Sequence, residues 1–477
     1  MFLFDLIKKD EAVTSADTVN VSVSGVKCDS RLICPNDVFF LISDDSSYVA
    51  EAVNRGASAI VVSDGVCTVC DVPVVKVPNV RMAYAVACQR SFGDPSKKMH
   101  LIGVTGTNGK TSVCMTVRHI LECAGHNVGA ISTIGNYIGP IKYETSYTTP
   151  PPDVLAQLFD RMAKAGTEYV VMETSSHALD QYRTAGLEFD VGIFTNLTRD
   201  HLDYHGTIDA CATSKSRLFE SSRISVINCD DEHASVMTNA ASGEIIRCSQ
   251  TDVKADYHAG NGITNDFGCE YDLSYKSGKT HIKTPLIGNF NIQNTMLAFA
   301  CARSVGTDEK TIVNALASIN PVQGRMETIR VGDATVVIDY AHTPDALQKV
   351  LEFLNKICRR YLITVFGCGG DRDRGKRAVM GKIAEKYSDA VILTEDNSRS
   401  ESTMDIIDDI LSGFDDKNHA IVIPNRYRAI IYTLCTAGDG DIVLLAGKGH
   451  EDYIIDSTGK KPFSERQIIN EYIKRTK

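Results

Sequence analysis

Short runs of apolar and β-branched residues recur along the chain, and segments with the apolar spacing of helices separate them. In the first part of the chain, strand-like runs lie at 21–26, 38–42, 59–62 and 74–77, and helix-like segments lie at 50–55 and 81–92. This alternation is typical of α/β domains. It predicts a small N-terminal α/β domain, which we place at residues 1–97 because turn-forming residues gather at its end.

The middle of the chain begins with an apolar run at 99–105 that leads straight into a glycine-rich turn. Further apolar runs follow at 169–172, 191–194 and 224–227, with helix-like segments between them. Continuous apolar strands spaced by helices indicate a mostly parallel sheet that helices cover. We predict a central domain over residues 98–325.

A new series of five strand-like runs starts beyond this segment. They lie at 334–338, 361–366, 390–393, 420–423 and 442–445, and helices such as 376–387 separate them. This order predicts a C-terminal, doubly wound, Rossmann-like domain over residues 326–477. The predicted fold class is therefore α/β, in three domains.

The composition argues against two classes of protein. The 477 residues carry 50 Lys plus Arg against 60 Asp plus Glu, a net charge of -10, which argues against binding of nucleic acid through its phosphates. No apolar run approaches the 18 or so residues that a membrane-spanning helix needs, so we expect no membrane insertion. The chain opens with its charges after a very short apolar stretch, unlike a secretory signal, and we expect a cytoplasmic protein.

The cysteines bear on the same question. All fifteen are scattered, and the one C-x-x-C pair, Cys67 and Cys70, has no second pair to complete a zinc site. We therefore expect reduced and mostly buried thiols.

A glycine-rich segment at 103–111 reads Gly-Val-Thr-Gly-Thr-Asn-Gly-Lys-Thr and joins a strand-like run to a helix-like one. Backbone N–H groups and a helix N-terminus converge in such a loop and bind phosphate oxygens. Lys110 is placed to pair with the β and γ phosphates and Thr111 to ligate Mg²⁺, although Val104 replaces the first glycine of the strict motif. The chain is thus predicted to bind ATP or another nucleotide, through Gly106, Thr107, Asn108, Gly109, Lys110, Thr111 and Ser112.

Polar groups also follow two other strand-like runs. Glu173 ends an apolar run, where it is either a ligand for a hard cation or a carboxylate that caps the next helix. His201, Asp203 and His205 crowd the segment after residues 191–194. Taken alone, they fit a transition-metal cluster, a set of catalytic bases or a solvated loop.

The loop at 105–111 resembles the form used by the Mur ligases, the ATP-dependent amide-forming enzymes of peptidoglycan precursor synthesis, and by the related folylpolyglutamate synthases. The segments around Glu173 and His201 are similar to Mur ligase signatures at a second Mg²⁺ site. The resemblance implies that Thr111, Glu173, His201 and Lys215 hold Mg²⁺, with a carbamate formed from CO₂ on Lys215. A carbamate is anionic and suits a cation that an ammonium group would repel.

Downstream segments extend the resemblance over residues from about 26 to 466. The segment at 288–294 resembles the family's adenine side, which implies that Asn294 binds ATP. The resemblance also implies that Arg325 approaches the transferring phosphoryl group and that Asp339 reaches back to the nucleotide. The implied catalytic residues are Lys110, Lys215 and Arg325.

The resemblance implies two further substrate sites. The site for UDP-N-acetylmuramoyl-L-alanyl-D-glutamate would be formed by Ser30, Thr148, Thr149, Ser175, Gln181 and Arg183. The site for meso-diaminopimelate would be formed by Arg372, Asp396, Asn397, Ser398, Arg399, Gly447 and Glu451. Diaminopimelate-adding members have proline where this chain has Ser398, and lysine-adding relatives lack the arginine that follows.

These implications describe a monomeric ligase that joins meso-diaminopimelate to the muramoyl dipeptide through an acyl phosphate, using ATP and Mg²⁺. Three alternatives stay open. The amino acid added is L-lysine or another diamino acid, the chain is a ligase like the folylpolyglutamate synthases, or it is a nucleotide-binding relative without catalysis.

Overall fold

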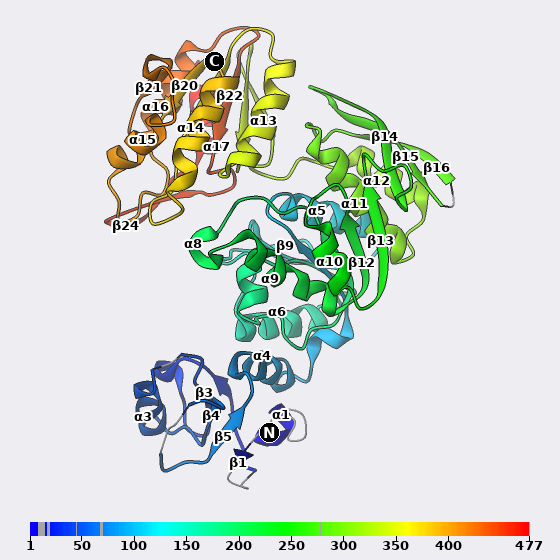
Figure 1. Cartoon of the computed structure of the whole chain (residues 1–477), viewed down its shortest axis with the longest axis vertical. Helices are drawn as coiled ribbons and strands as arrows, with labels where there is room; N and C mark the ends of the chain where they lie inside the picture. Colours follow the sequence, from blue (N-terminus) through cyan, green and yellow to red (C-terminus); the bar gives the residue numbers. More distant parts are fainter. Residues whose placement is uncertain (8–14, 17–19, 44, 67–69, 277, 477) are drawn as a thin grey trace.

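The computed structural model describes residues 1–7, 15–16, 20–43, 45–66, 70–276 and 278–476. Three β-sheets flanked by helices follow one another along its long axis, from the N-terminus at one end to the C-terminal part at the other (Figure 1). Each sheet lies inside one of the three predicted segments, and the predicted α/β class is confirmed. The boundaries at 97/98 and 325/326 themselves stay predictions.

The N-terminal sheet has the order β1-β5-β4-β3-β2, and only β1 runs antiparallel to its neighbour. Its strands are β1 (Ser15–Ala16), β2 (Val26–Lys27), β3 (Val38–Phe40), β4 (Ala59–Ser63) and β5 (Val74–Val77). Helices α1 (Leu3–Ile7) and α4 (Val80–Ser91) pack on one face, and α3 (Ser47–Asn54) packs on the other. The α3 and α4 positions agree with the helical segments predicted from the sequence.

One predicted strand of this domain is wrong. The run at 21–26 enters the sheet only at its last residue. Its earlier backbone groups bond to the start of the chain instead, where Leu3 N–H donates to Val21 O and Val23 N–H donates to Met1 O. A strand-like composition cannot distinguish these two partners, because both satisfy the same backbone groups.

The central sheet has eleven strands in the order β16-β15-β14-β13-β12-β11-β6-β10-β7-β8-β9. Their bounds are β6 (His100–Thr105), β7 (Val128–Ser132), β8 (Gly135–Ile138), β9 (Ile141–Tyr143), β10 (Tyr169–Glu173), β11 (Phe189–Phe194), β12 (Ser222–Asn228), β13 (Glu244–Ser249), β14 (Tyr257–Asn265), β15 (Gly268–Tyr275) and β16 (Gly278–Thr284). The four strands predicted from the sequence, β6, β10, β11 and β12, are confirmed and are mutually parallel. Because β6 lies between β10 and β11, the loops that follow these three strands meet at one edge.

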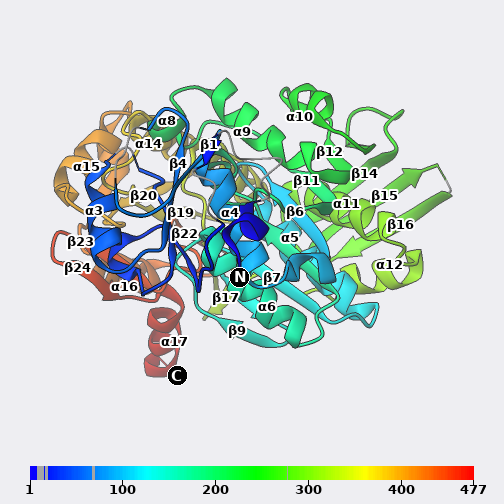
Figure 2. The same ribbon diagram turned by 90° about the horizontal axis from the view of Figure 1, so that it is seen from below.

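Helices cover both faces of this parallel part. One face carries α5 (Lys110–Cys123), α11 (Phe290–Ser304) and α12 (Glu309–Ser318). The other carries α6 (Pro152–Lys164), α9 (Ile208–Glu220) and α10 (Ala234–Ala240), and the short helices α7 (Ser176–Asp180) and α8 (Leu202–His205) lie in the connecting loops. The antiparallel strands β14 to β16 extend the sheet to the margin of the molecule (Figure 2).

The C-terminal sheet has the order β17-β18-β22-β19-β20-β21. All five predicted strands are present as β18 (Ala334–Asp339), β19 (Leu362–Phe366), β20 (Ala390–Leu393), β21 (Ala420–Val422) and β22 (Ile442–Ala446), and β17 (Glu327–Val331) adds an antiparallel edge. Helices α13 (Pro344–Ile357), α14 (Gly375–Tyr387) and α15 (Thr403–Leu411) cover one face, and α16 (Arg426–Thr436) and α17 (Glu465–Thr476) cover the other. A hairpin of β23 (Tyr453–Asp456) and β24 (Gly459–Pro462) follows β22.

Within the described part of the chain, no helix has the length and apolarity to cross a membrane. The fourteen described cysteines are all free thiols, but only half of them are buried. Cys67 of the C-x-x-C pair lies outside the described residues.

Candidate functional site

The phosphate loop connects β6 to α5 and requires its two inner glycines. Gly106 has φ +149° and Gly109 has φ +85°, in the region that L side chains rarely adopt. A Cβ atom at Gly106 would lie 1.9 Å from Thr195 Oγ1, and one at Gly109 would lie 2.6 Å from Asn294 Oδ1. Because neither position accepts a side chain, the loop backbone and the N-terminus of α5 stay open for anionic oxygens.

Lys110 folds back over this loop. Its ammonium donates hydrogen bonds of 2.9 Å to the carbonyl oxygens of Gly106 and Thr107. Burial lowers the pKa of Lys110, and the nearby carboxylates of Glu173 and Asp200 oppose that shift. The cation therefore lies at the position where the motif requires it, held by backbone carbonyls.

Glu173 ends β10 beside this loop and is 1% exposed. Its carboxylate accepts hydrogen bonds from Thr111 Oγ1 at 2.8 Å and from the backbone and hydroxyl of Thr133 at 2.9 and 3.1 Å. The hydroxyl of Thr111 also accepts from Arg325 Nη2 at 3.1 Å. The structure thus brings together Thr111, Glu173 and Arg325, which the sequence had selected separately. Thr133 was missed because nothing in its local sequence marks it.

Arg325 crosses from the linking segment to the central domain. Its guanidinium lies 4.6 Å from the centroid of the Tyr340 ring, and its buried Nε has no hydrogen-bond partner among the described residues. Asp339 accepts hydrogen bonds from Met326 N–H at 2.7 Å and Ala341 N–H at 2.8 Å. Asp339 thereby fixes the turn that carries Arg325. An arginine held in this way, with an unpaired N–H, suits an anionic ligand.

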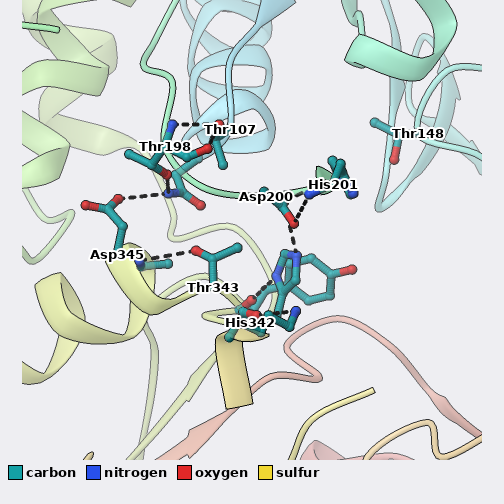
Figure 3. Close-up of polar contacts among 12 residues, drawn as sticks. Thr107, Thr148, Thr198, Asp200, His201, His342, Thr343 and Asp345 are labelled. Atoms are coloured by element: carbon teal, nitrogen blue, oxygen red, sulfur yellow. Dashed lines mark hydrogen bonds and ion pairs between the residues drawn. The ribbon is translucent and has the colours of Figure 1, made fainter. Parts of the chain in front are cut away.

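The loop after β11 carries a carboxylate that the sequence analysis missed. Asp200 lies between two imidazoles, 3.3 Å from His201 Nε2 and 3.8 Å from His342 Nε2 (Figure 3). His342 belongs to the C-terminal domain, so this group spans the domain boundary. Burial lowers the pKa of His201 to about 3, which leaves its ring neutral and able to ligate a metal. The sequence signal that marks Asp200 is its place directly before His201.

Lys215 lies on α9 beneath the phosphate loop. It is 2% exposed, and its ammonium donates a 3.0 Å hydrogen bond to Gly106 O. Burial lowers its pKa to about 8. Lys215 is therefore buried although it lies on a helix, and its amine is neutral in part of the molecules near neutral pH.

A metal ion at this site would need ligands in addition to the side chains that lie close together here. Among the described residues, no three His, Cys, Asp or Glu side chains gather as a ready metal site, so His201, Asp203 and His205 do not form a transition-metal cluster. The pair of Thr111 hydroxyl and Glu173 carboxylate is nevertheless a donor set that a hard cation such as Mg²⁺ prefers. The remaining ligands would have to come from phosphate oxygens or water, or from a modified side chain.

A cavity of about 660 Å³ lies between the central and C-terminal domains. The face of α13 lines one side of this cavity. The rest of the lining includes nearly all the residues predicted to bind the nucleotide or the metal, namely Thr107, Asn108, Gly109, Lys110, Thr111, Ser112, Glu173, His201, Asn294, Arg325 and Asp339. Asn294 donates a 3.0 Å hydrogen bond to Asn291 Oδ1 there. The volume is in the range of nucleotide and cofactor sites.

Five of the six residues predicted to bind the muramoyl dipeptide form one network. Thr149 Oγ1 donates to Glu173 O at 2.8 Å and accepts from Ser175 N–H at 3.0 Å. Arg183 donates to Thr149 O at 2.7 Å and to Gln181 Oε1 at 2.8 Å. Thr148 joins through a 3.1 Å hydrogen bond from Thr133. Ser30 is separate, because it lies in the N-terminal domain with its hydroxyl bonded to Glu51.

The residues predicted to bind the incoming amino acid follow β19, β20 and β22, which are neighbours in the sheet. Asn397 Nδ2 donates to Glu451 Oε2 at 2.9 Å, and Arg399 Nη1 donates to Gly370 O at 2.7 Å. Gly447 has φ +107°, and a Cβ there would lie 2.8 Å from Asp396 Oδ2. The backbone oxygen of Ser398 lies against Gly370, and Arg372 is exposed on the same loop edge.

Two protein families match the chain. Residues 104–302 match the Mur ligase middle domain, and residues 324–449 match the glutamate ligase domain of the Mur ligases. The chain is 39% identical to UDP-N-acetylmuramoyl-L-alanyl-D-glutamate--2,6-diaminopimelate ligase 1 of Clostridium acetobutylicum, over 96% of each chain. It is also 39% identical to the corresponding diaminopimelate ligase of Pseudomonas aeruginosa, over 92% of each chain.

Solved structures agree with this relationship. A structure of a UDP-N-acetylmuramoyl-L-alanyl-D-glutamate--2,6-diaminopimelate ligase matches with a TM-score of 0.69 and 33% identity, over 95% of each chain. A folylpolyglutamate synthase of Mycobacterium tuberculosis matches with a TM-score of 0.65 and 18% identity, over 77% of this chain and 92% of that one. The second likeness is one of fold alone.

Proposed function

The chain belongs to the Mur ligase family, and we propose that it uses ATP to join meso-2,6-diaminopimelate to UDP-N-acetylmuramoyl-L-alanyl-D-glutamate. The observation that carries this proposal is the near full-length identity of 36–39% to relatives that bear this activity in their names. The folylpolyglutamate synthase alternative has only a likeness of fold in its favour. The proposal places the protein in the cytoplasm as a monomer that acts on small molecules.

The geometry of the cavity supports ATP as the phosphoryl donor. With phosphates in the loop, Lys110 exchanges the carbonyls of Gly106 and Thr107 for phosphate oxygens. Arg325 reaches the same place from the C-terminal side through Thr111. An oxygen of the acceptor's D-glutamate carboxylate attacks the γ-phosphorus, the bond to the oxygen that bridges the β- and γ-phosphorus breaks, and ADP leaves. The product is an acyl phosphate, and both cations stabilise the charge that spreads over the phosphoryl oxygens during the transfer.

The amide then forms at the acyl phosphate. The amino group of diaminopimelate attacks the carbonyl carbon, a C–N bond forms, and inorganic phosphate leaves with the C–O electron pair. The amine loses a proton in this step. Because the cavity lies between two domains, their approach keeps water from hydrolysing the acyl phosphate.

The residues present fit Mg²⁺. Thr111, Glu173 and His201 would hold it, together with a carbamate on Lys215, and bound Mg²⁺ would screen the repulsion between the carboxylate and the polyphosphate. Carbamylation requires a neutral amine, and the buried Lys215 with its lowered pKa supplies one. Its nitrogen attacks CO₂, a C–N bond forms and one proton is released. The resulting anion replaces a cation beside the phosphate loop.

Substrate carboxylates are assigned to arginines. Arg183, bonded to Thr149 and Gln181, is placed to hold a carboxylate of the dipeptide. Arg399 and Arg372 flank Gly369, and with Glu451 they supply both charges that the far end of diaminopimelate requires. L-Lysine lacks the far carboxylate, so it would leave an arginine without a partner.

The test is phosphate release by the purified protein with ATP, Mg²⁺ and UDP-muramoyl dipeptide, in the presence of meso-diaminopimelate, of L-lysine or of no amino acid. Of these three mixtures, we expect phosphate release only in the one that contains meso-diaminopimelate. Its product should be heavier than the dipeptide substrate by one diaminopimelate residue. Release with lysine instead would contradict the assignment of Arg399. Stoichiometric ATP binding without release in any mixture would identify a relative that has lost catalysis.

A further inference from the structure

A lysine with no access to solvent lies beside the proposed amino-acid site. Lys448 follows β22, and its side chain is 0% exposed. The ammonium donates hydrogen bonds of 3.1 Å to Asn397 Oδ1 and 3.1 Å to Glu451 Oε2, and it lies 3.5 Å from Asp396 Oδ1. The two hydrogen bonds and the ion pair with Asp396 surround the ammonium, and none of the side chain is open to solvent. Lys448 is therefore out of reach of a ligand.

The side chain of Asn397 is held in the same way. Its Oδ1 accepts from Lys448 and, at 3.0 Å, from the backbone N–H of Ile455. Its Nδ2 donates to Glu451 Oε2 at 2.9 Å. Both lone-pair directions of Oδ1 are thus taken by the protein, and the amide cannot rotate without losing a bond. Asn397 acts as a brace between Lys448 and the hairpin that begins at β23.

Glu451 shows an asymmetry between its two oxygens. Oε2 accepts from both Lys448 and Asn397, whereas Oε1 has only a 3.5 Å contact with the hydroxyl of Tyr453 among the described residues. The side chain is 13% exposed, in contrast to the lysine beneath it. The carboxylate is thus fixed through one oxygen, and the other is available for an ammonium group of a ligand.

Charge balance requires the buried lysine. Asp396 and Glu451 are two carboxylates within reach of one cation. Burial alone would raise the pKa of Asp396, but the charges of Lys448 and Arg426 outweigh it and keep that pKa below its ordinary value. Without Lys448, two carboxylates would face each other in a low-dielectric pocket, and one would take up a proton or turn away.

We propose that Lys448 is a positioning residue for the incoming amino acid, which it never contacts, and that it acts by fixing Glu451 so that Oε1 faces the far ammonium of the substrate. This inference rests on the proposed function, because it takes Glu451 as the group that meets diaminopimelate. The role is one of selectivity and affinity. It predicts an effect on the KM for diaminopimelate that is separate from any effect on ATP.

The test compares Lys448→Met, Glu451→Gln and their combination with a matched control, Lys460→Met. Lys460 lies on the exposed strand β24, 3.8 Å from the centroid of the Tyr453 ring, and Lys448 lies 5.7 Å from the same ring. Among the described residues, Lys460 has no hydrogen bond or ion pair with Glu451, so its loss changes a lysine beside this ring and leaves the contacts of Lys448 and Asn397 intact. We expect Lys448→Met to raise the KM for diaminopimelate at least about tenfold, the size of one lost charge-assisted hydrogen bond. The KM for ATP should be unchanged, and Lys460→Met should match the wild type.

The double variant separates positioning from general stability. If Lys448 acts through Glu451, the pair Lys448→Met with Glu451→Gln should have the same KM for diaminopimelate as Glu451→Gln alone. A further rise in the double variant would overturn the proposal, and so would an unchanged KM in Lys448→Met. If Lys448→Met does not fold, the double variant, which loses one positive and one negative charge, replaces it. Its KM for diaminopimelate is then compared with that of Glu451→Gln, and a higher KM in the double variant would overturn the proposal.

Failure of the proposed function would look different. If the wild-type protein turns over L-lysine in place of diaminopimelate, the assignment of the substrate is wrong. The same KM comparison is then made with L-lysine, whose far end also carries an ammonium. An unchanged KM for that amino acid in Lys448→Met would overturn the positioning role independently.

Discussion

The side-chain amide of Asn108 donates a 3.0 Å hydrogen bond to the carboxylate of Asp345, which joins the phosphate loop to the first turn of α13. A second contact across the same boundary pairs Arg199 with Asp373 at 3.2 Å. The loop that would hold the nucleotide is thus bonded directly to the C-terminal domain. Binding at the loop and the position of that domain should therefore be energetically coupled.

A double-mutant cycle on Asn108 and Asp345 measures this coupling. We expect Asn108→Ala and Asp345→Ala each to lower kcat/KM for ATP. The double variant should have a kcat/KM for ATP no lower than that of the less active single variant, which corresponds to a coupling energy of about 1–2 kcal/mol. Lys349→Ala is the control, because Lys349 pairs with Asp345 at 3.0 Å but does not touch the loop. Strictly additive losses would show that the bond carries no coupling.

If Lys215 is carbamylated as proposed, the recovery of activity by CO₂-depleted enzyme should increase with pH. Only the neutral amine attacks CO₂, and with a pKa of about 8 the neutral fraction rises with pH. At a fixed concentration of dissolved CO₂, the rate at which CO₂-depleted enzyme regains activity should increase about tenfold from pH 7 to pH 9. Lys215→Ala should lose turnover, and added formate or acetate should restore part of it. Full activity of the variant without any additive would rule out the carbamate.

Arg399 should control the choice of amino acid. The backbone of Arg399 has φ +52°, and its guanidinium donates a hydrogen bond to Gly370 O. The guanidinium is therefore fixed before any ligand binds. We expect Arg399→Ala to raise the KM for diaminopimelate by about ten- to a hundredfold and to leave the KM for ATP unchanged, since a bound carboxylate loses its partner. Arg374→Ala is a matched control, because Arg374 is exposed and pairs with Glu401 at 2.7 Å. Equal effects in both variants would contradict a specific role.

The buried pair of Arg426 and Glu465 should be a stability determinant of the C-terminal domain. The two side chains are 0% and 1% exposed and lie 2.9 Å apart. Removing one partner strands the other charge, so Arg426→Met should cost about 3–5 kcal/mol in the free energy of unfolding. Adding Glu465→Met should recover much of this loss. Calorimetric unfolding of the three proteins checks both statements, and a double variant no more stable than the single one would refute the argument.

The same pair predicts how that defect depends on pH. Burial raises the pKa of Glu465 above its ordinary value, and loss of Arg426 would raise it further. A carboxyl with a higher pKa in the folded than in the unfolded state binds more protons when folded, so stability rises as the pH falls. The deficit of Arg426→Met relative to the wild type should therefore be smaller at pH 5.5 than at pH 7.5. A deficit that grows on acidification would mean that Glu465 does not carry the effect.

Local features of this site were readable from the sequence because each is built by neighbours in the chain. The loop around Gly106 and Gly109 needs glycine for its own φ angles, and Glu173 marks the end of an apolar strand. The five C-terminal strands were predicted for the same reason, since continuous apolar runs between helices have few other structures open to them. The strand predicted at 21–26 failed because its backbone groups bond to residues 1–3 at the start of the chain and not to a neighbouring strand of the sheet.

Residues that work across the domains were not predictable in this way. Asp200 and His342 lie 142 positions apart in number, and Asn108 and Asp345 lie 237 apart, so no periodicity connects them. The burial of Lys448 has no local signature, because a lysine in a loop is exposed in most proteins. Lys215 became a candidate only through a family resemblance. Tertiary packing, within the domains for Lys448 and Lys215 and between them for the two other pairs, decides these contacts, and the local pattern of the chain does not contain it.

Two of the three N–H groups of Lys110 donate to carbonyl oxygens of the phosphate loop. These carbonyl oxygens would compete with phosphate oxygens for the ammonium. A nucleotide would therefore have to bind Lys110 more strongly than the two carbonyl dipoles do. A triphosphate reaches far enough to make that exchange, whereas a nucleotide that ends at its α-phosphate does not. The hydrogen bonds that Lys110 makes to the loop carbonyls would thus favour nucleotides with a long phosphate chain over nucleotides with a short one.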